Sequence, residues 1–190
     1  MSHPHTSRLI HDPRHAAALI RCGGVVAYAT EAVFGLGCDP TNPSAVKRLL
    51  NIKQRDPAKG LILIAAEFSQ LAPYLKPLDR SLTARAHGSW PGPVTWLWPA
   101  TPDTPDWLTG DHDTLAVRVT NHPQAAALCR LAGPLVSTSA NLSGQEPARS
   151  AQVVAEQLHH LLDGILAGNV GDRDRPSEIR DVLSGEVLRA

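Results

Sequence analysis

The stretch VVAYATEAVFGLG, residues 25–37, decides the fold. Its apolar first part follows Gly23-Gly24, which predicts a buried strand over residues 25–29, entered from the end of a helix. A hydroxyl (Thr30), a carboxylate (Glu31) and closely spaced glycines then stand at the end of the strand, a combination that suits binding of a small polar ligand. An ordinary turn capped by Thr30 explains the same residues. Spacing alone favours the turn, because the stretch is neither GxGxxG nor a Walker loop.

Helices and further strands are expected on both sides of this stretch. Asp12-Pro13 and Asn42-Pro43 each place a capping side chain before a proline, which predicts helix starts. We expect helices over residues 12–22, from residue 42, over 122–131 and over 150–162, and further strands over residues 61–64, 94–98, 115–120 and 135–138, with short strands near 165 and 187. This order has no strict βαβ rhythm. It predicts an α/β (α+β-like) fold: a single domain over residues 1–190 with a mixed open sheet and flanking helices.

Composition excludes several classes of protein. Lys plus Arg and Asp plus Glu number 18 each, so bulk charge does not drive non-specific binding to nucleic acid. No stretch resembles a secretory signal or reaches the roughly 20 apolar residues of a membrane span, which predicts a soluble, cytoplasmic protein with no membrane association. Three widely spaced cysteines, with no CxxC or HExxH pattern, argue against a disulfide framework, a zinc site and any metal held by the protein.

A basic loop joins a predicted helix to a predicted buried strand. Lys53, Arg55 and Lys59 lie within seven residues of it. A guanidinium offers paired hydrogen bonds to phosphate and an ammonium acts as a movable point charge. A solvated loop at a helix C-terminus, where cations suit the helix dipole, explains the pattern equally well.

The stretch STSANLSG, residues 137–144, directly follows another apolar strand. Small hydrogen-bonding side chains at the end of a central strand favour a ligand site. A turn closed by Asn and Ser side chains, or a serine nucleophile, would use the same residue types. The nucleophile interpretation is rejected, because GxSxG and a matching His–Asp pair are absent.

Arg118 lies in the middle of an otherwise apolar strand, TLAVRV, and alternation places it on the same face as Thr114. An arginine there is costly to bury without a partner. The alternatives are a buried ion pair and a ligand that carries a carboxylate, and we favour the ligand.

Together these stretches resemble the threonylcarbamoyl-AMP synthase family of YrdC-like proteins, in its short single-domain bacterial form. The resemblance runs from about residue 23 to 189 and is carried by TEAVFGLGCD, the KxR of residues 53–55, PGPVT, LAVRV, the SxN of residues 139–141 and PSEIRD. It implies a twisted sheet around a large concave, positively charged cavity. It also implies an ATP-dependent nucleotidyltransferase that converts L-threonine, bicarbonate and ATP to threonylcarbamoyl-AMP and pyrophosphate. Other proteins would then transfer the threonylcarbamoyl group to tRNA, and tRNA itself is a candidate partner.

The resemblance also implies site residues. The set implied to hold the nucleotide and carry the catalysis is Lys53, Arg55, Ser139 and Asn141. Further contacts to ATP are implied for Lys59, Thr114 and Arg189. Threonine is expected to be held by Thr30, Arg118, Ser137 and Ser177. No metal ligand is expected, because Mg²⁺ would be carried by the phosphates and water. Lys59-Gly60 replaces an Asn-Pro of longer relatives, and Ile64 replaces a histidine, so that histidine contact is not carried over.

Three other functions are compatible with parts of the sequence. An RNA-binding module would use a basic groove on double-stranded RNA, tRNA or a maturing ribosome, but zero net charge and 4% aromatic residues argue against it. A carbamoyl-transfer enzyme of the hydrogenase-maturation type would need acylphosphatase-like or zinc-finger segments, which this sequence lacks. A purely structural domain would leave the buried Arg118 and the STSAN run unexplained.

Overall fold

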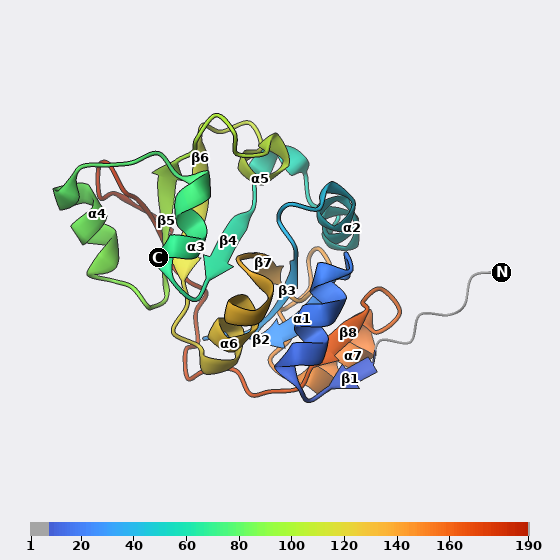
Figure 1. Cartoon of the computed structure of the whole chain (residues 1–190). Helices are drawn as coiled ribbons and strands as arrows, with labels where there is room; N and C mark the ends of the chain where they lie inside the picture. The colour runs from blue at the N-terminus through green and yellow to red at the C-terminus, as the bar shows by residue number, and fades with distance from the viewer. Residues whose placement is uncertain (1–7, 190) are drawn as a thin grey trace.

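One mixed β-sheet of ten strands runs through the protein, whose computed structural model describes residues 8–189 (Figure 1). The strands are β1 Arg8–Ile10, β2 Val26–Ala29, β3 Phe34–Cys38, β4 Ile62–Ala65, β5 Val94–Pro99, β6 Thr114–Val119, β7 Leu135–Ser139, β8 Gly164–Leu166, β9 Glu178–Asp181 and β10 Val187–Arg189. Their order across the sheet is β1-β8-β2-β3-β7-β4-β6-β5-β9-β10. The sheet contains both parallel pairs, such as β4 with β6, and antiparallel pairs, such as β2 with β3.

The helices flank this sheet on both sides. They are α1 Pro13–Arg21, α2 Pro43–Lys53, α3 Phe68–Leu71, α4 Arg80–His87, α5 Asp106–Thr109, α6 Pro123–Ala132 and α7 Ala151–Leu158, with 3-10 turns η1 Pro57–Lys59 and η2 Ala72–Tyr74. The predicted mixed open sheet with flanking helices is confirmed. None of the helices within residues 8–189 combines the length and apolar character needed to cross a bilayer.

Capping side chains start the longer helices where the sequence predicts. Asp12 accepts from the backbone N–H of Arg14, and Asn42 accepts from that of Ala45. Ser150 caps α7 in the same way, but this helix ends at Leu158 rather than at residue 162. The chain turns there because it must enter β8 at residue 164.

The main difference from the sequence prediction is β3. Residues 30–37 were expected to form a ligand loop or a turn, but the turn is short: the Thr30 hydroxyl donates to the Val33 carbonyl at 2.7 Å. From Phe34 onward the chain is a fully buried strand, paired with both β2 and β7. Two of its five residues are glycines, and the sequence therefore does not predict a strand here, because glycine is depleted in strands. Strands β1 and β9 and the short helices α3 to α5 were also not predicted.

The two faces of the sheet are covered differently. On one face Ala27, Leu36 and Leu63 belong to the larger core, together with residues of α2 and α7. On the other face Val26 and Ile64 pack with residues of α1 and α6. Figure 1 shows these two helices together in front of β2 and β7. They cover only part of this second face, and the remainder is open to the cavity described below.

Two glycines leave room for a tyrosine ring on the second face. Tyr28 is the Cα partner of Gly35, and its side chain is fully buried. A Cβ on Gly37 would lie 2.7 Å from Cε1 of Tyr28 and 2.8 Å from the carbonyl oxygen of Val136. The glycines of β3 therefore make room for the ring of Tyr28, and Gly35 also lines the cavity described below.

Gly37→Ala tests this packing. We expect it to lower the free energy of unfolding by about 1–3 kcal/mol, because the new methyl group overlaps both the ring and the backbone. Urea denaturation measures the change. Gly88→Ala is the control, since a Cβ there meets nothing closer than 3.4 Å and should leave stability unaffected. Equal stability of the two variants would show that the ring is not confined.

Candidate functional site

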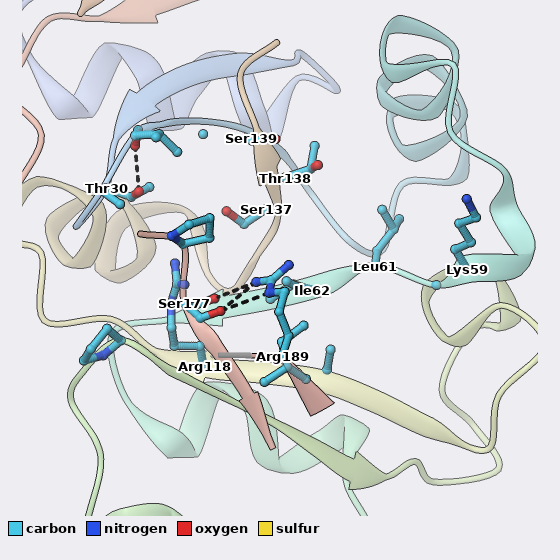
Figure 2. A pocket seen from close by; sticks show the side chains of 18 of the residues that line it. Thr30, Lys59, Leu61, Ile62, Arg118, Ser137, Thr138, Ser139, Ser177 and Arg189 are labelled. Carbon is cyan, nitrogen blue, oxygen red and sulfur yellow. Dashed lines mark hydrogen bonds between the residues drawn. The ribbon is translucent and has the colours of Figure 1, made fainter. Parts of the chain in front are cut away.

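The open part of the second sheet face is the floor of a cavity of about 500 Å³ (Figure 2). Ser137, Ile62 and Ala116 are Cα partners across β7, β4 and β6 and form a row on this floor. The small side chains in this row leave space above the sheet. The walls come from loops at residues 30–34, 55–61, 108–114 and 173–177, and from β10.

Arg118 lies on this floor with its charge only partly matched. Its Nη2 lies 3.5 Å from Oε2 of Glu31, and about 10% of each side chain is exposed. Burial raises the pKa of the Glu31 carboxyl, but the charge of Arg118 and a hydrogen bond from Thr120 bring it below its ordinary value. Nε of Arg118 and Oε2 of Glu31 have no hydrogen-bond partner in the described structure. The buried ion pair is therefore present, and the guanidinium that makes it also lines the cavity.

Hydroxyl groups stand near this guanidinium in the cavity wall. Ser137 accepts a hydrogen bond from the Tyr28 hydroxyl at 2.9 Å, and Ser177 accepts one from the Thr95 hydroxyl at 3.0 Å. Thr30 lines the cavity as well, although its own hydrogen is used within the turn. The structure thus brings Thr30, Arg118, Ser137 and Ser177 to one cavity, as Figure 2 shows.

A second set of cationic groups lines the same cavity. Nη2 of Arg189 donates to the carbonyl oxygen of Ser177 at 2.7 Å. Burial, followed by the charges of Arg118 and Arg55, lowers the pKa of the Arg189 guanidinium. Arg55 donates to the Gly60 carbonyl through Nε and Nη2, which leaves Nη1 for another partner. The exposed ammonium of Lys59 lies across the cavity in Figure 2.

Lys53 and Asn141 are placed behind the cavity wall and do not line it. Nζ of Lys53 donates to the carbonyl oxygens of Ser139 and Asn141 at 2.7 and 2.5 Å, and to Oδ1 of Asn141 at 2.7 Å. Burial, with a smaller contribution from Arg55, lowers the pKa of this ammonium to about 8. Lys53 therefore holds the turn that presents Ser139, which does line the cavity. A direct contact of Lys53 or Asn141 with ATP stays a prediction.

Several residues of the site were not among the predicted ones. The sequence indicates Glu31 only as a possible ligand group and does not predict its ion pair with Arg118. Arg173 and Arg175 line the cavity from a loop that lies against Glu31, where Arg173 N–H donates to the Glu31 carbonyl at 3.2 Å. His112 contributes from the loop before β6. The run DRDRP at residues 172–176 is the sequence feature that could indicate these arginines, because it places both of them just before the PSEIRD stretch.

The ionisable lining is dominated by cations. Arg55, Lys59, Arg118, Arg173, Arg175 and Arg189 face one carboxylate, Glu31, whose Oε1 already accepts from the Thr120 hydroxyl at 2.6 Å. Such a lining suits an anionic ligand of high charge. Within residues 8–189 no three His, Cys, Asp or Glu side chains are grouped as a metal site requires. The residues of the cavity therefore do not fit a Mg²⁺ ion bound by the protein itself.

Comparison with known proteins places the chain in a family. It matches the family model Sua5_yciO_yrdC, described as "Telomere recombination", over residues 18–190. This chain belongs to the Sua5/YciO/YrdC family. The fold of the family is also found in solved structures. P. abyssi Sua5 complexed with L-threonine is 34% identical with a TM-score of 0.87, and the match covers 96% of this chain and 56% of that longer one. E. coli YciO is 26% identical with a TM-score of 0.80, and covers 100% and 98%.

Two curated relatives are named threonylcarbamoyl-AMP synthase. Threonylcarbamoyl-AMP synthase of Nitrosococcus oceani is 56% identical over 93% of this chain and 96% of the relative. The protein of the same name from Coxiella burnetii strain RSA 493 is 50% identical over 92% and 94%. These matches span nearly the whole length of each relative.

Lys53→Met tests how the turn at residues 139–141 is held. It removes the donor of three hydrogen bonds to oxygens, so we expect the free energy of unfolding to fall by about 1–3 kcal/mol in urea denaturation. Lys47→Met, on the exposed side of the same helix, is the matched control and should change stability by less than about 0.5 kcal/mol. If the two variants are equally stable, the ammonium does not hold this turn.

Proposed function

We propose that this chain is a threonylcarbamoyl-AMP synthase, which joins L-threonine, bicarbonate and ATP and releases pyrophosphate. The observation that carries the proposal is the buried, incompletely paired Arg118 on the floor of a cavity otherwise rimmed by cations. Such a cavity accommodates two anions, a small carboxylate at Arg118 and a polyphosphate at the rim. The shared name of the curated relatives supports the same activity.

The amino acid is proposed to lie at Arg118. The guanidinium of Arg118 lines the cavity and offers a charge-assisted hydrogen bond to the carboxylate, which is stronger than a neutral one. The hydroxyls of Ser137 and Ser177 lie in the same cavity wall, and Thr30 shapes the adjacent turn. Binding of L-threonine by the solved P. abyssi relative agrees with this assignment.

The nucleotide is proposed to lie along the remaining lining residues. The groups available to ATP are Arg55, Lys59, Thr114, Ser139 and Arg189. Lys53 and Asn141 would act from behind the wall, by fixing the turn that carries Ser139. Mg²⁺ would be carried by the phosphates and water, since the lining supplies one carboxylate that is already engaged.

The chemistry then depends on placement rather than on a protein nucleophile. The amine of threonine and bicarbonate form a carbamate with loss of water. A carbamate oxygen attacks the α-phosphorus of ATP, the bond to the β-phosphate oxygen breaks, and pyrophosphate leaves with that electron pair. Holding the reactants in line and surrounding the developing charge with fixed donors and cations accounts for the acceleration.

The product contains a reactive mixed anhydride, which activates the threonylcarbamoyl group for transfer to an acceptor. We propose that separate proteins transfer the threonylcarbamoyl group to tRNA in the cytoplasm, and that residues 1–190 act as one domain in this step. Direct binding of tRNA to this chain is not required by the cavity.

Pyrophosphate release from ATP tests the function. The proposal predicts that release requires both threonine and bicarbonate, and stops when either is omitted. Release that is independent of both would contradict it. A salt-dependent mobility shift with duplex RNA or tRNA, in the absence of such turnover, would instead support the RNA-binding module.

Arg118→Ala separates the two halves of the site. We expect the KM for threonine to rise about 10- to 100-fold, because a charge-assisted contact to the carboxylate is lost, while the KM for ATP changes less than about twofold. Arg130→Ala, an exposed arginine on α6 outside the cavity, is the control. Equal increases in both KM values would remove Arg118 from the amino-acid site.

A further inference from the structure

Two buried hydroxyl groups stand directly behind the two serines of the proposed amino-acid site. The Tyr28 hydroxyl donates to Oγ of Ser137, and the Thr95 hydroxyl donates to Oγ of Ser177. Tyr28 and Thr95 have no exposed surface, and neither lines the cavity. Neither can contact a ligand, so any influence they have on one must pass through the serines.

The direction of these hydrogen bonds follows from burial. Within residues 8–189 the Tyr28 hydroxyl makes no other hydrogen bond, so its hydrogen would be buried without an acceptor if Ser137 were the donor. Burial also raises the pKa of this phenol, which keeps it protonated. At the second serine, Oγ of Ser177 accepts from Thr95 and, at 3.4 Å, from Nη2 of Arg189.

A serine hydroxyl has one hydrogen and can accept two hydrogen bonds. When the protein supplies the donors behind it, the serine's own hydrogen remains for a partner in front. Ser137 and Ser177 both face the cavity, and both are set in this way. The oxygen of Ser177 already accepts from Thr95 and Arg189, so only its hydrogen remains for a ligand, whereas Ser137 keeps its hydrogen and one acceptor position. With the guanidinium of Arg118 in the same cavity, these hydrogens match a carboxylate.

We propose that Tyr28 and Thr95 are positioning residues that commit the hydroxyls of Ser137 and Ser177 to donate to the carboxylate of the amino-acid substrate. This inference rests on the proposed function in one respect, the identity of that carboxylate. It also gives a use to the glycines of β3, because Gly35 and Gly37 leave the space through which the Tyr28 ring reaches Ser137.

Four double-mutant cycles test the proposal in the pyrophosphate assay. Tyr28→Phe and Thr95→Val remove one hydroxyl each and nearly keep the side-chain shape. Each is combined with Ser137→Ala and with Ser177→Ala. Tyr74→Phe, the same chemical change outside the cavity, is the control. Circular dichroism checks that every variant is folded.

We expect Tyr28→Phe and Thr95→Val each to raise the KM for threonine about threefold to tenfold, the size of one neutral hydrogen bond, and to leave the KM for ATP unchanged. Tyr28→Phe should add nothing to Ser137→Ala but should multiply with Ser177→Ala. Thr95→Val should show the opposite pattern. Multiplication in every combination, or a parallel rise in the KM for ATP, would overturn the proposal, since a general structural role predicts such results.

Crystal structures of the ligand-free variants test the positioning step without reference to the reaction. The Ser137 side chain should occupy more than one rotamer in Tyr28→Phe and a single one in Thr95→Val, and Ser177 should behave in the reverse way. Unchanged single rotamers in both variants would refute the positioning role even if the synthase activity is present. If the wild-type protein shows no threonine-dependent turnover, the proposed function fails, and the rotamers alone decide the positioning role.

Discussion

Arg118 carries a positive charge into an otherwise mostly apolar strand, β6, and much of the site follows from the need to match that charge. An unpaired buried charge is costly, and breaking a buried pair costs several kcal/mol. Glu31 provides the partner, but at 3.5 Å and with one oxygen lacking a hydrogen bond the match is incomplete. Glu31 is in turn held by the Thr120 hydroxyl and the Asn121 N–H. The turn after β2 is thereby fixed to the end of β6, and the cavity lies where these two segments meet.

The second constraint is space. A cavity opens on a sheet face where side chains are small, and the floor includes Gly35, Ala116 and Ser137 beside Ile62. Such a floor buries little apolar surface and contributes little stability. The surrounding structure compensates with contacts that bridge distant parts of the chain. Lys53 holds the turn at residues 139–141, and Arg189 holds the loop at Ser177. Lys53 and Arg189 thus hold the cavity walls through hydrogen bonds, and the small residues of the floor contribute little to this.

The sequence predicts features that depend on neighbouring residues better than features that depend on contacts between residues far apart in the chain. Local features are predicted well: Asp12 and Asn42 cap their helices, and alternation places Arg118 on the face of Thr114. Strand β3 is not predicted, because its glycines are required by the Tyr28 ring of the neighbouring strand β2 and not by any local pattern. Lys53 was expected at the nucleotide, yet its ammonium contacts oxygens 86 and 88 residues away. No local pattern encodes such contacts, and only the family resemblance brought these residues into one site.

A crystal structure of the protein with L-threonine, in the absence of nucleotide, tests the central claim most directly. The account predicts that a carboxylate oxygen lies within about 3 Å of a guanidinium nitrogen of Arg118 and within hydrogen-bond distance of the Ser137 and Ser177 hydroxyls. An amino acid bound with its carboxylate at Lys59 or Arg55, and its side chain or amine at Arg118, would contradict it.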